Sequence, residues 1–108
     1  MAAKYTERLK NKIITPSIPD GYGSAWAQYS SFGESSDHRT EIQERLKNHD
    51  IPTATYYPRP VHLQTAFTKL GYREGDFPVS ESTSERIFSL PMHPYFTESD
   101  IEKITSLV

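Results

Sequence analysis

The chain contains no cysteine, which excludes disulfide bonds, iron–sulfur clusters and thiol catalysis. It has no run of ~20 apolar residues, the length that spans a bilayer, and its first residues, MAAKYTE, lack the apolar core of a signal peptide. It also lacks an excess of either charge, because 12 Lys and Arg stand against 14 Asp and Glu. This balance provides no electrostatic basis for binding nucleic acid or an anionic membrane. Together these absences predict a cytoplasmic protein.

Large aliphatic residues and phenylalanine are scarce. Leu, Ile, Val and Phe make up 22 of 108 residues, which lies close to the composition of disordered chains. The net charge of only −2 argues against disorder, and the length is about that of one domain. We therefore expect a folded unit with a thin core and limited stability on its own.

Hydrophobic periodicity predicts a mixed α/β (α+β) unit with a small sheet of about three strands and helices packed on it. The expected helices are 3–12, 39–48, 63–70, 80–87 and a last one opening at 97–100, and the expected strands are 25–32, 51–57 and 88–92. The order strand, helix, strand over the first two strands predicts a right-handed crossover between parallel strands. Trp26 heads the first strand and is expected to be substantially buried, and Asp100 takes the acidic position of a capping box.

Most motifs of catalysis are absent. The histidines lack metal-ligand spacing, no Gly-x-Ser-x-Gly sequence occurs, and Gly21 and Gly23 precede a strand, where a dinucleotide-binding loop would follow one. Glu81 and Glu85 lie one helical turn apart, a spacing that more often reflects surface charge than an acid pair. No catalytic residue and no metal ligand is therefore predicted.

One segment stands out, YYPRPVHLQ at residues 56–64. Its two prolines hold the backbone extended, and it follows a predicted strand at the end where α/β folds commonly bind ligands. Tyr57 and His62 are the first candidates for contacts with a ligand, and Tyr56 and Gln64 are weaker ones. The alternative is structural: Tyr57 packs on proline and His62 caps the next helix.

Several motifs in a fixed order resemble the C-terminal part of the DegT/DnrJ family of pyridoxal-phosphate-dependent nucleotide-sugar aminotransferases. They are WAQYS, a helix of the form R-x-x-I-x-x-x-L, YYPRPVHLQTAF, GYREGDFPVSE and IFSLPMHPYFTESDIEKI, within a match from Tyr5 to Val108. The departures are mild. Val61 stands where the family usually has leucine, and His49-Asp50 replaces a glycine after the long helix, where aspartate tolerates left-handed backbone.

The resemblance implies a fold-type-I aminotransferase, of which residues 1–108 are the C-terminal small domain. Residues 1–14 would form a leading helix that joins a missing large domain, and 24–108 the α/β core. None of the six lysines lies in the family's serine-rich lysine motif, so pyridoxal phosphate is expected in the parent enzyme, a homodimer by resemblance, and not on this chain alone. Tyr57 and His62, then Tyr56 and Gln64, are implied as contacts to the nucleotide-sugar.

A second interpretation belongs to a different class: a free-standing, non-catalytic α/β interaction domain. The nucleotide sequence upstream of Met1 discriminates between the two. A reading frame that continues into a cofactor-binding domain favours the aminotransferase.

Overall fold

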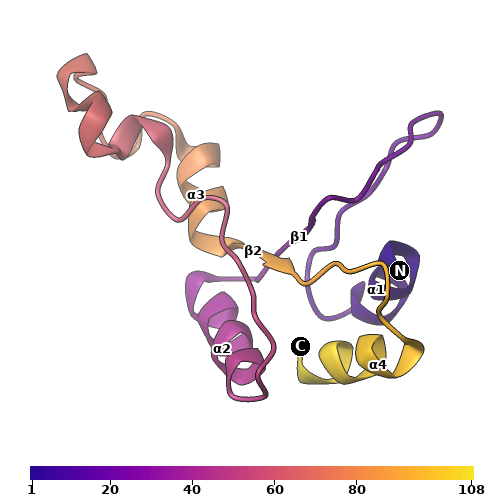
Figure 1. The fold of residues 1–108 in the computed structure, drawn as a ribbon. Helices are drawn as coiled ribbons and strands as arrows, with labels where there is room; N and C mark the ends of the chain where they lie inside the picture. Colours follow the sequence, from indigo (N-terminus) through magenta and orange to yellow (C-terminus); the bar gives the residue numbers. More distant parts are fainter.

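The computed structural model describes residues 1–108 and contains four α-helices, two strands and two 3-10 helices (Figure 1). In chain order they are α1 (Ala2–Leu9), β1 (Tyr29–Phe32), α2 (Ser36–Lys47), η1 (Val61–Leu63), η2 (Thr65–Leu70), α3 (Pro78–Arg86), β2 (Ile87–Leu90) and α4 (Glu98–Leu107). The mixed α/β class expected from the sequence is confirmed. None of the helices is both long enough and apolar enough to cross a bilayer.

The sheet is small and antiparallel. β1 pairs with β2 from Tyr29 opposite Leu90 to Phe32 opposite Ile87. Single antiparallel bridges extend it on both sides, one from Ile14 to Phe32 and one from Ala54 to Ser89. β1 and the Ala54 segment both run antiparallel to β2, so they run parallel to each other on opposite sides of it, as the predicted crossover through α2 requires, although they do not pair directly. The predicted strand at 51–57 is reduced to the bridge at Ala54.

Proline explains why that third strand stays short. Pro52 and Pro58 bracket the bridge, and neither has the backbone N–H that a continued ladder would need. Ala54 makes both of its backbone hydrogen bonds to Ser89, at 3.2 and 2.7 Å, and the pairing ends there. The sheet thus has two full strands instead of the expected three.

The core lies where α1, α2 and α4 meet the sheet, with α1 and α4 side by side (Figure 1). The apolar residues at helical spacing on α1 and α2 face this core: Tyr5, Leu9, Ile42 and Leu46. The buried hydrophobic residues are Ala2, Tyr5, Leu9, Ile13, Tyr29, Ile42, Leu46, Ile51, Phe88, Leu90, Ile101 and Ile104. Because Tyr5 and Leu9 are fully buried among residues of the other elements, the leading helix is part of this core.

Side-chain caps begin two of these helices, α2 and α4. The Ser35 side chain accepts the His38 N–H at 3.1 Å at the start of α2. At α4 the Thr97 side chain accepts the Asp100 N–H while Asp100 accepts the Thr97 N–H, so the predicted capping box is confirmed. The Asp100 carboxylate accepts hydrogen bonds from the Thr97 hydroxyl at 2.7 Å and from the Thr97 N–H at 2.8 Å, and these two bonds lower the pKa of the carboxyl.

Trp26 does not head the first strand as expected. Its φ of 51° is incompatible with a pleated strand, and its backbone N–H donates to the Ser24 hydroxyl at 3.1 Å in a local turn. Its ring is half-buried against Tyr29, with 5.7 Å between ring centroids. Tyr29 and Ser31 instead form the inward face of β1. Tyr29, rather than Trp26, is the buried aromatic residue of this strand.

Two buried tyrosines couple α1 to the sheet and to the loop after β2. The Tyr5 hydroxyl donates to the Pro91 carbonyl at 2.9 Å, and the Tyr29 hydroxyl is 2.8 Å from the Thr6 hydroxyl. Burial raises the pKa of both phenols, and for Tyr5 the nearby Tyr29 and Asp100 raise it further. Both groups are therefore held in the neutral form.

We predict that the fold is lost in alkali at the pH where exposed tyrosines ionise. A raised pKa in the folded state means that its stabilising contribution is complete below the ordinary tyrosine value of 10.0 and is lost as pH rises above it. Circular dichroism between about pH 9 and pH 12 should show cooperative unfolding. Tyr5→Phe should move this transition to higher pH, whereas Tyr22→Phe, at an exposed site, should not. Equal midpoints in both variants would contradict the prediction.

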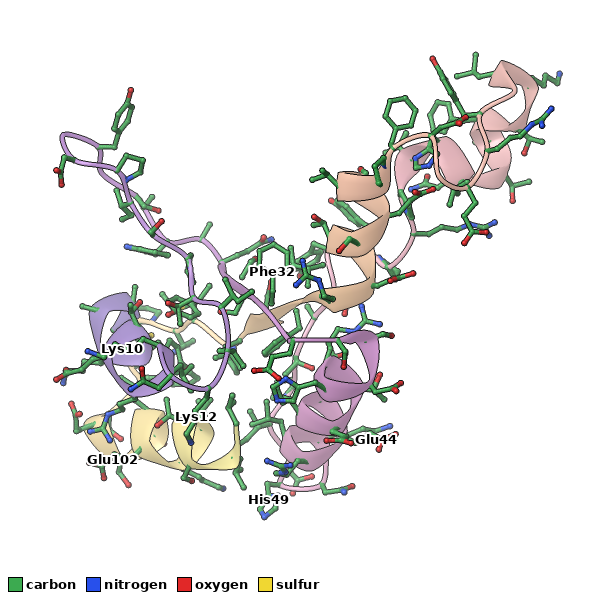
Figure 2. All side chains as sticks on the ribbon, turned by 180° about the vertical axis from the view of Figure 1, so that it is seen from behind. Lys10, Lys12, Phe32, Glu44, His49 and Glu102 are labelled. Carbon is green, nitrogen blue, oxygen red and sulfur yellow. The ribbon has the colours of Figure 1, made fainter.

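The chain is less compact than an ordinary domain of its length. Its radius of gyration is 15.5 Å, against about 13 Å for a compact domain of 100 residues. Two excursions account for the difference, a long loop at 15–28 and a projection at 56–81 (Figure 1). They carry most of the exposed large hydrophobic side chains, among them Ile18, Tyr22, Val61, Leu70 and Val79. Away from these two excursions, the segment after α1 is bonded to α4: the Lys12 ammonium donates to the Thr105 carbonyl at 2.9 Å (Figure 2 shows Lys12 from behind).

Candidate functional site

The projection at residues 56–81, called the arm below, contains all four predicted site residues. It leaves the sheet after the Ala54 bridge, turns through η1 and η2, and returns to α3 (Figure 1). Gly71, with φ 77°, ends η2 as the sequence predicts for its helix at 63–70. α3 begins at Pro78 after Phe77, with no side-chain cap, so it starts two residues before the helix that the sequence predicts at 80–87.

His62 and Glu81 form a buried pair at the centre of the arm. The His62 Nε2 lies 3.0 Å from Glu81 Oε1, and the two side chains are only 7% and 15% exposed. The Gly75 N–H donates to the same carboxylate, at 2.8 Å to Oε1 and 3.1 Å to Oε2. The interpretation of Glu81 as surface charge is therefore wrong, because its carboxylate joins η1, the loop after η2 and α3.

Aromatic rings cover this pair on one side. The Phe77 ring packs edge to face against the His62 imidazole, with 4.8 Å between ring centroids, and against the Tyr72 ring, with 5.1 Å between centroids. Beside them lies a groove of about 330 Å³ lined by Val61, His62, Phe67, Leu70, Tyr72, Phe77 and Ser80. His62 is thus a polar group in the wall of a mainly apolar groove, an arrangement typical of ligand sites.

The other three predicted residues lie apart from this groove. The Tyr56 and Tyr57 rings are 5.8 Å apart and 43% and 70% exposed. Tyr56 lines a second groove, of about 250 Å³, that includes Pro91 and Met92. The Gln64 side chain donates to the Arg59 carbonyl at 3.2 Å, which turns its amide back onto the segment. The structure therefore places the four candidates on one segment without gathering them into one cavity.

Two expectations about this segment need correction. It does not follow the end of a strand, because only the single bridge at Ala54 precedes it. His62 also caps no helix: Pro60 and Gln64 hold the N-cap positions of η1 and η2, and the imidazole bonds to Glu81 instead. The backbone is nevertheless extended at Pro60, with φ −60° and ψ 148°, as its proline predicts.

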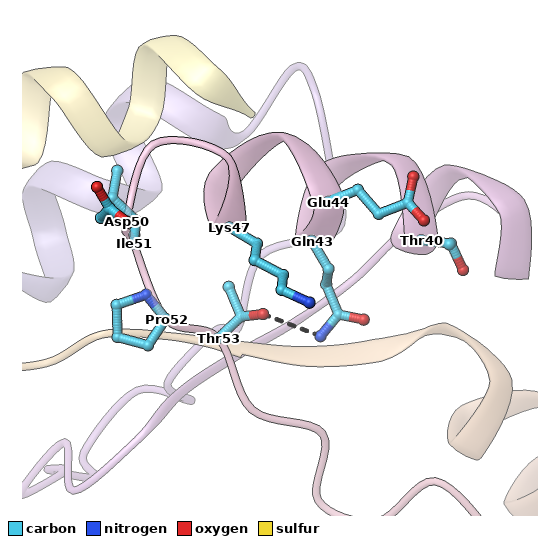
Figure 3. A pocket seen from close by; sticks show the side chains of 8 residues that line it. All are labelled: Thr40, Gln43, Glu44, Lys47, Asp50, Ile51, Pro52 and Thr53. Carbon is cyan, nitrogen blue, oxygen red and sulfur yellow. Dashed lines mark hydrogen bonds between the residues drawn. The ribbon is translucent and has the colours of Figure 1, made fainter.

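A larger groove lies elsewhere, along α2. It measures about 700 Å³ and is lined by Thr40, Gln43, Glu44, Lys47, Asp50, Ile51, Pro52 and Thr53. Figure 3 shows the Lys47 side chain extending along the groove beside Gln43, whose amide donates to the Thr53 hydroxyl at 3.1 Å. None of the predicted site residues lies here.

The lysines of the chain do not fit a complete pyridoxal phosphate site. Such a site needs a lysine amine facing the aldehyde, donors for the phosphate and an acid at the pyridine nitrogen. All six lysines are exposed, and Lys47, the one in the α2 groove, shares it with Glu44 and Asp50, whose charges repel a phosphate. No step of cofactor chemistry is assigned to this chain.

Comparison with known proteins identifies the family. The family model described as the DegT/DnrJ/EryC1/StrS aminotransferase family matches residues 1–108. The chain belongs to this family. The resemblance expected from its motifs is therefore confirmed over the whole length of the chain.

The relatives are much longer than the chain. A pleiotropic regulatory protein of Geobacillus stearothermophilus is 38% identical over 95% of this chain and 29% of its own length. The UDP-2-acetamido-2-deoxy-3-oxo-D-glucuronate aminotransferase of Pseudomonas aeruginosa is 35% identical over 96% of this chain and 28% of its own. The crystal structure of a family member from Brucella abortus, 44% identical, superposes with a TM-score of 0.87 over 98% of this chain and 28% of that one.

Proposed function

We propose that the chain is the C-terminal small domain of a pyridoxal-phosphate-dependent aminotransferase that acts on a nucleotide-linked keto-sugar. The observation that carries the proposal is that the family model matches residues 1–108 while the chain spans under a third of its relatives. The Pseudomonas aeruginosa relative is named for a UDP-linked oxo-sugar, which supports this substrate class. The parent enzyme would transfer an amino group, commonly from glutamate, to the keto-sugar.

In this proposal the chain supplies one wall of the substrate site and no catalytic lysine. When bound elsewhere in the enzyme, the cofactor supplies the electron sink for amino transfer. Tyr57, 70% exposed, can offer its hydroxyl to phosphate or sugar oxygens, and His62 can offer an imidazole nitrogen. Tyr56 and Gln64 are secondary contacts. These roles bind and orient the nucleotide-sugar.

The partners follow from the shape of the chain. Its exposed apolar side chains at 15–28 and on the arm suit coverage by a large domain, and residues 1–14 would join that domain to the core at 24–108. The complete enzyme is proposed to be a cytoplasmic homodimer. A free-standing interaction domain gains no support of its own from the fold.

Reductive labelling tests the proposal directly. The reading frame is extended upstream of Met1, and the complete protein and the 108-residue chain are each treated with pyridoxal phosphate and borohydride. The complete protein should take up one equivalent at a lysine outside residues 1–108 and should aminate UDP- or dTDP-linked keto-sugars. The chain alone should show no specific label. Stoichiometric labelling at one of the six lysines, or a frame that begins at Met1 with no upstream domain, would contradict the proposal.

A further inference from the structure

We infer that Glu81 is the positioning residue of His62, an assignment that rests on the proposed function for its consequence in catalysis. The observation is the hydrogen bond between His62 Nε2 and Glu81 Oε1 at 3.0 Å, with both side chains largely buried. The partner lies 19 residues away in the sequence, on a different element. Glu81 therefore joins two segments of the arm through the imidazole ring.

The carboxylate is itself held in place. The Gly75 N–H donates to both of its oxygens, at 2.8 and 3.1 Å, which fixes Glu81 against the loop between η2 and α3. Burying a carboxylate without hydrogen-bond partners costs folding free energy. The Gly75 N–H and the His62 imidazole supply these partners, which accounts for the position of Glu81. Phe77, 4.8 Å from the imidazole, confines the plane of the ring. His62 is thus constrained by the carboxylate, by Phe77 and by the extended backbone before it.

The pairing also determines which ring nitrogen carries a proton. An ionised carboxylate only accepts hydrogen bonds, so Nε2 must be the N–H donor toward Glu81. Nδ1 is then the nitrogen available to a ligand. In a neutral ring it accepts a hydroxyl hydrogen, and in a protonated ring it donates to an anionic oxygen. Glu81 thereby sets the chemistry that His62 offers to the substrate without touching the substrate itself.

Nitrogen-15 NMR of the 108-residue chain tests the assignment without any enzyme assay. In the unsubstituted chain, the neutral form of the His62 imidazole should be mainly the Nε2–H tautomer, with its signals identified by their loss in His62→Ala. Glu81→Ala should give a mixture of both tautomers, whereas Glu81→Gln, which keeps an oxygen acceptor, should retain the Nε2–H form. Glu85→Ala, one turn away and exposed, is the matched control. A tautomer mixture in the unsubstituted chain would overturn the assignment even if Glu81→Ala failed to fold.

Steady-state kinetics of the complete enzyme provide a second test of the Glu81 assignment. Glu81→Ala should raise the KM for the nucleotide-sugar about tenfold and leave cofactor absorbance unchanged, with Glu81→Gln closer to the parent enzyme. A merely structural role would lower the amount of active enzyme and leave KM unchanged. An unsubstituted complete protein without aminotransferase activity would end the proposed function while leaving the NMR result intact. Equal KM values in an active enzyme and its Glu81→Ala variant would end the positioning role.

Discussion

Replacing Tyr29 with alanine should lower the free energy of unfolding of the chain by about 3–5 kcal/mol. Its ring is fully buried and lies 5.1 Å from the Tyr5 ring, at the place where α1 meets the sheet. The substitution removes this packing and also leaves Thr6 without its hydroxyl partner. Because small domains have about 5–15 kcal/mol of stability, and the core here is thin, this one change should leave little folded protein.

The same truncation at Trp26 should cost less, roughly 1–2 kcal/mol, although tryptophan is the larger side chain. Trp26 is half-buried at the edge of the core and lies outside β1. Because part of the Trp26 ring is already exposed to water, its removal loses less buried apolar area than removal of a core residue. Urea unfolding of both variants, followed by circular dichroism, measures the difference. The free energy of unfolding of Tyr29→Ala should be far below that of Trp26→Ala.

Tyr29→Phe provides the matched control for the hydroxyl alone. It keeps the ring against Tyr5 and removes the hydrogen bond to Thr6, which should cost about 1 kcal/mol. A larger loss for Trp26→Ala than for Tyr29→Ala would show that Trp26, and not Tyr29, dominates this part of the core.

The helices were predictable because their signals are local. Tyr5 and Leu9 recur at helical spacing on α1 and are fully buried, although α1 ends at Leu9, short of the helix predicted over 3–12, and Ile13 is buried in the turn that follows. Thr97 and Asp100 contain the complete hydrogen-bonding pattern that opens α4 within four residues. Asp50 adopts the left-handed backbone, φ 59°, for which aspartate was judged tolerable in place of glycine. In each case neighbouring residues determine the conformation.

The sheet was harder to predict because its pairing is not local. Ser30 and Ser89, whose hydroxyls are 2.8 Å apart across β1 and β2, are separated by 59 residues. Neither short strand contains information about its partner, so element order indicates that β1 and the Ala54 segment run parallel but not that β2 lies between them. The positive φ of Trp26 and the prolines around Ala54 then shortened two strands that alternation had predicted to be longer.

The site was predictable only in part, for the same physical reason. The prolines before His62 identified an unusual segment, and the family resemblance implied its role. Nothing in the sequence connects His62 with Glu81, because α3 meets η1 only after the loop at 71–77 has folded back. Glu81 has the spacing of an ordinary surface acid, and only the Gly75 and His62 contacts distinguish it from Glu85.

Replacing His62 with alanine in the complete enzyme should raise the KM for the nucleotide-sugar about tenfold or more, and change kcat less. A hydrogen bond from an imidazole to a charged oxygen contributes about 1.5–3 kcal/mol, which corresponds to a tenfold or larger change in affinity. Absorbance of the bound cofactor should stay unchanged, because His62 is proposed to bind the substrate. Steady-state kinetics at saturating amino donor, varying the nucleotide-sugar alone, measures this effect.

In the isolated chain the effect of His62→Ala should be confined to the arm. The imidazole bonds only within the arm, to Glu81, so its loss leaves a largely buried carboxylate with Gly75 as its remaining partner. Amide hydrogen exchange should therefore accelerate at 73–81, while protection of Ile42 and Leu46 in the core of α2 is retained, as expected for local opening. His38→Ala is the matched control, since its imidazole accepts the Glu34 N–H at the start of α2 and lies outside the arm. Unchanged KM in His62→Ala would exclude a substrate contact, and faster exchange at the arm would then assign His62 a purely structural role.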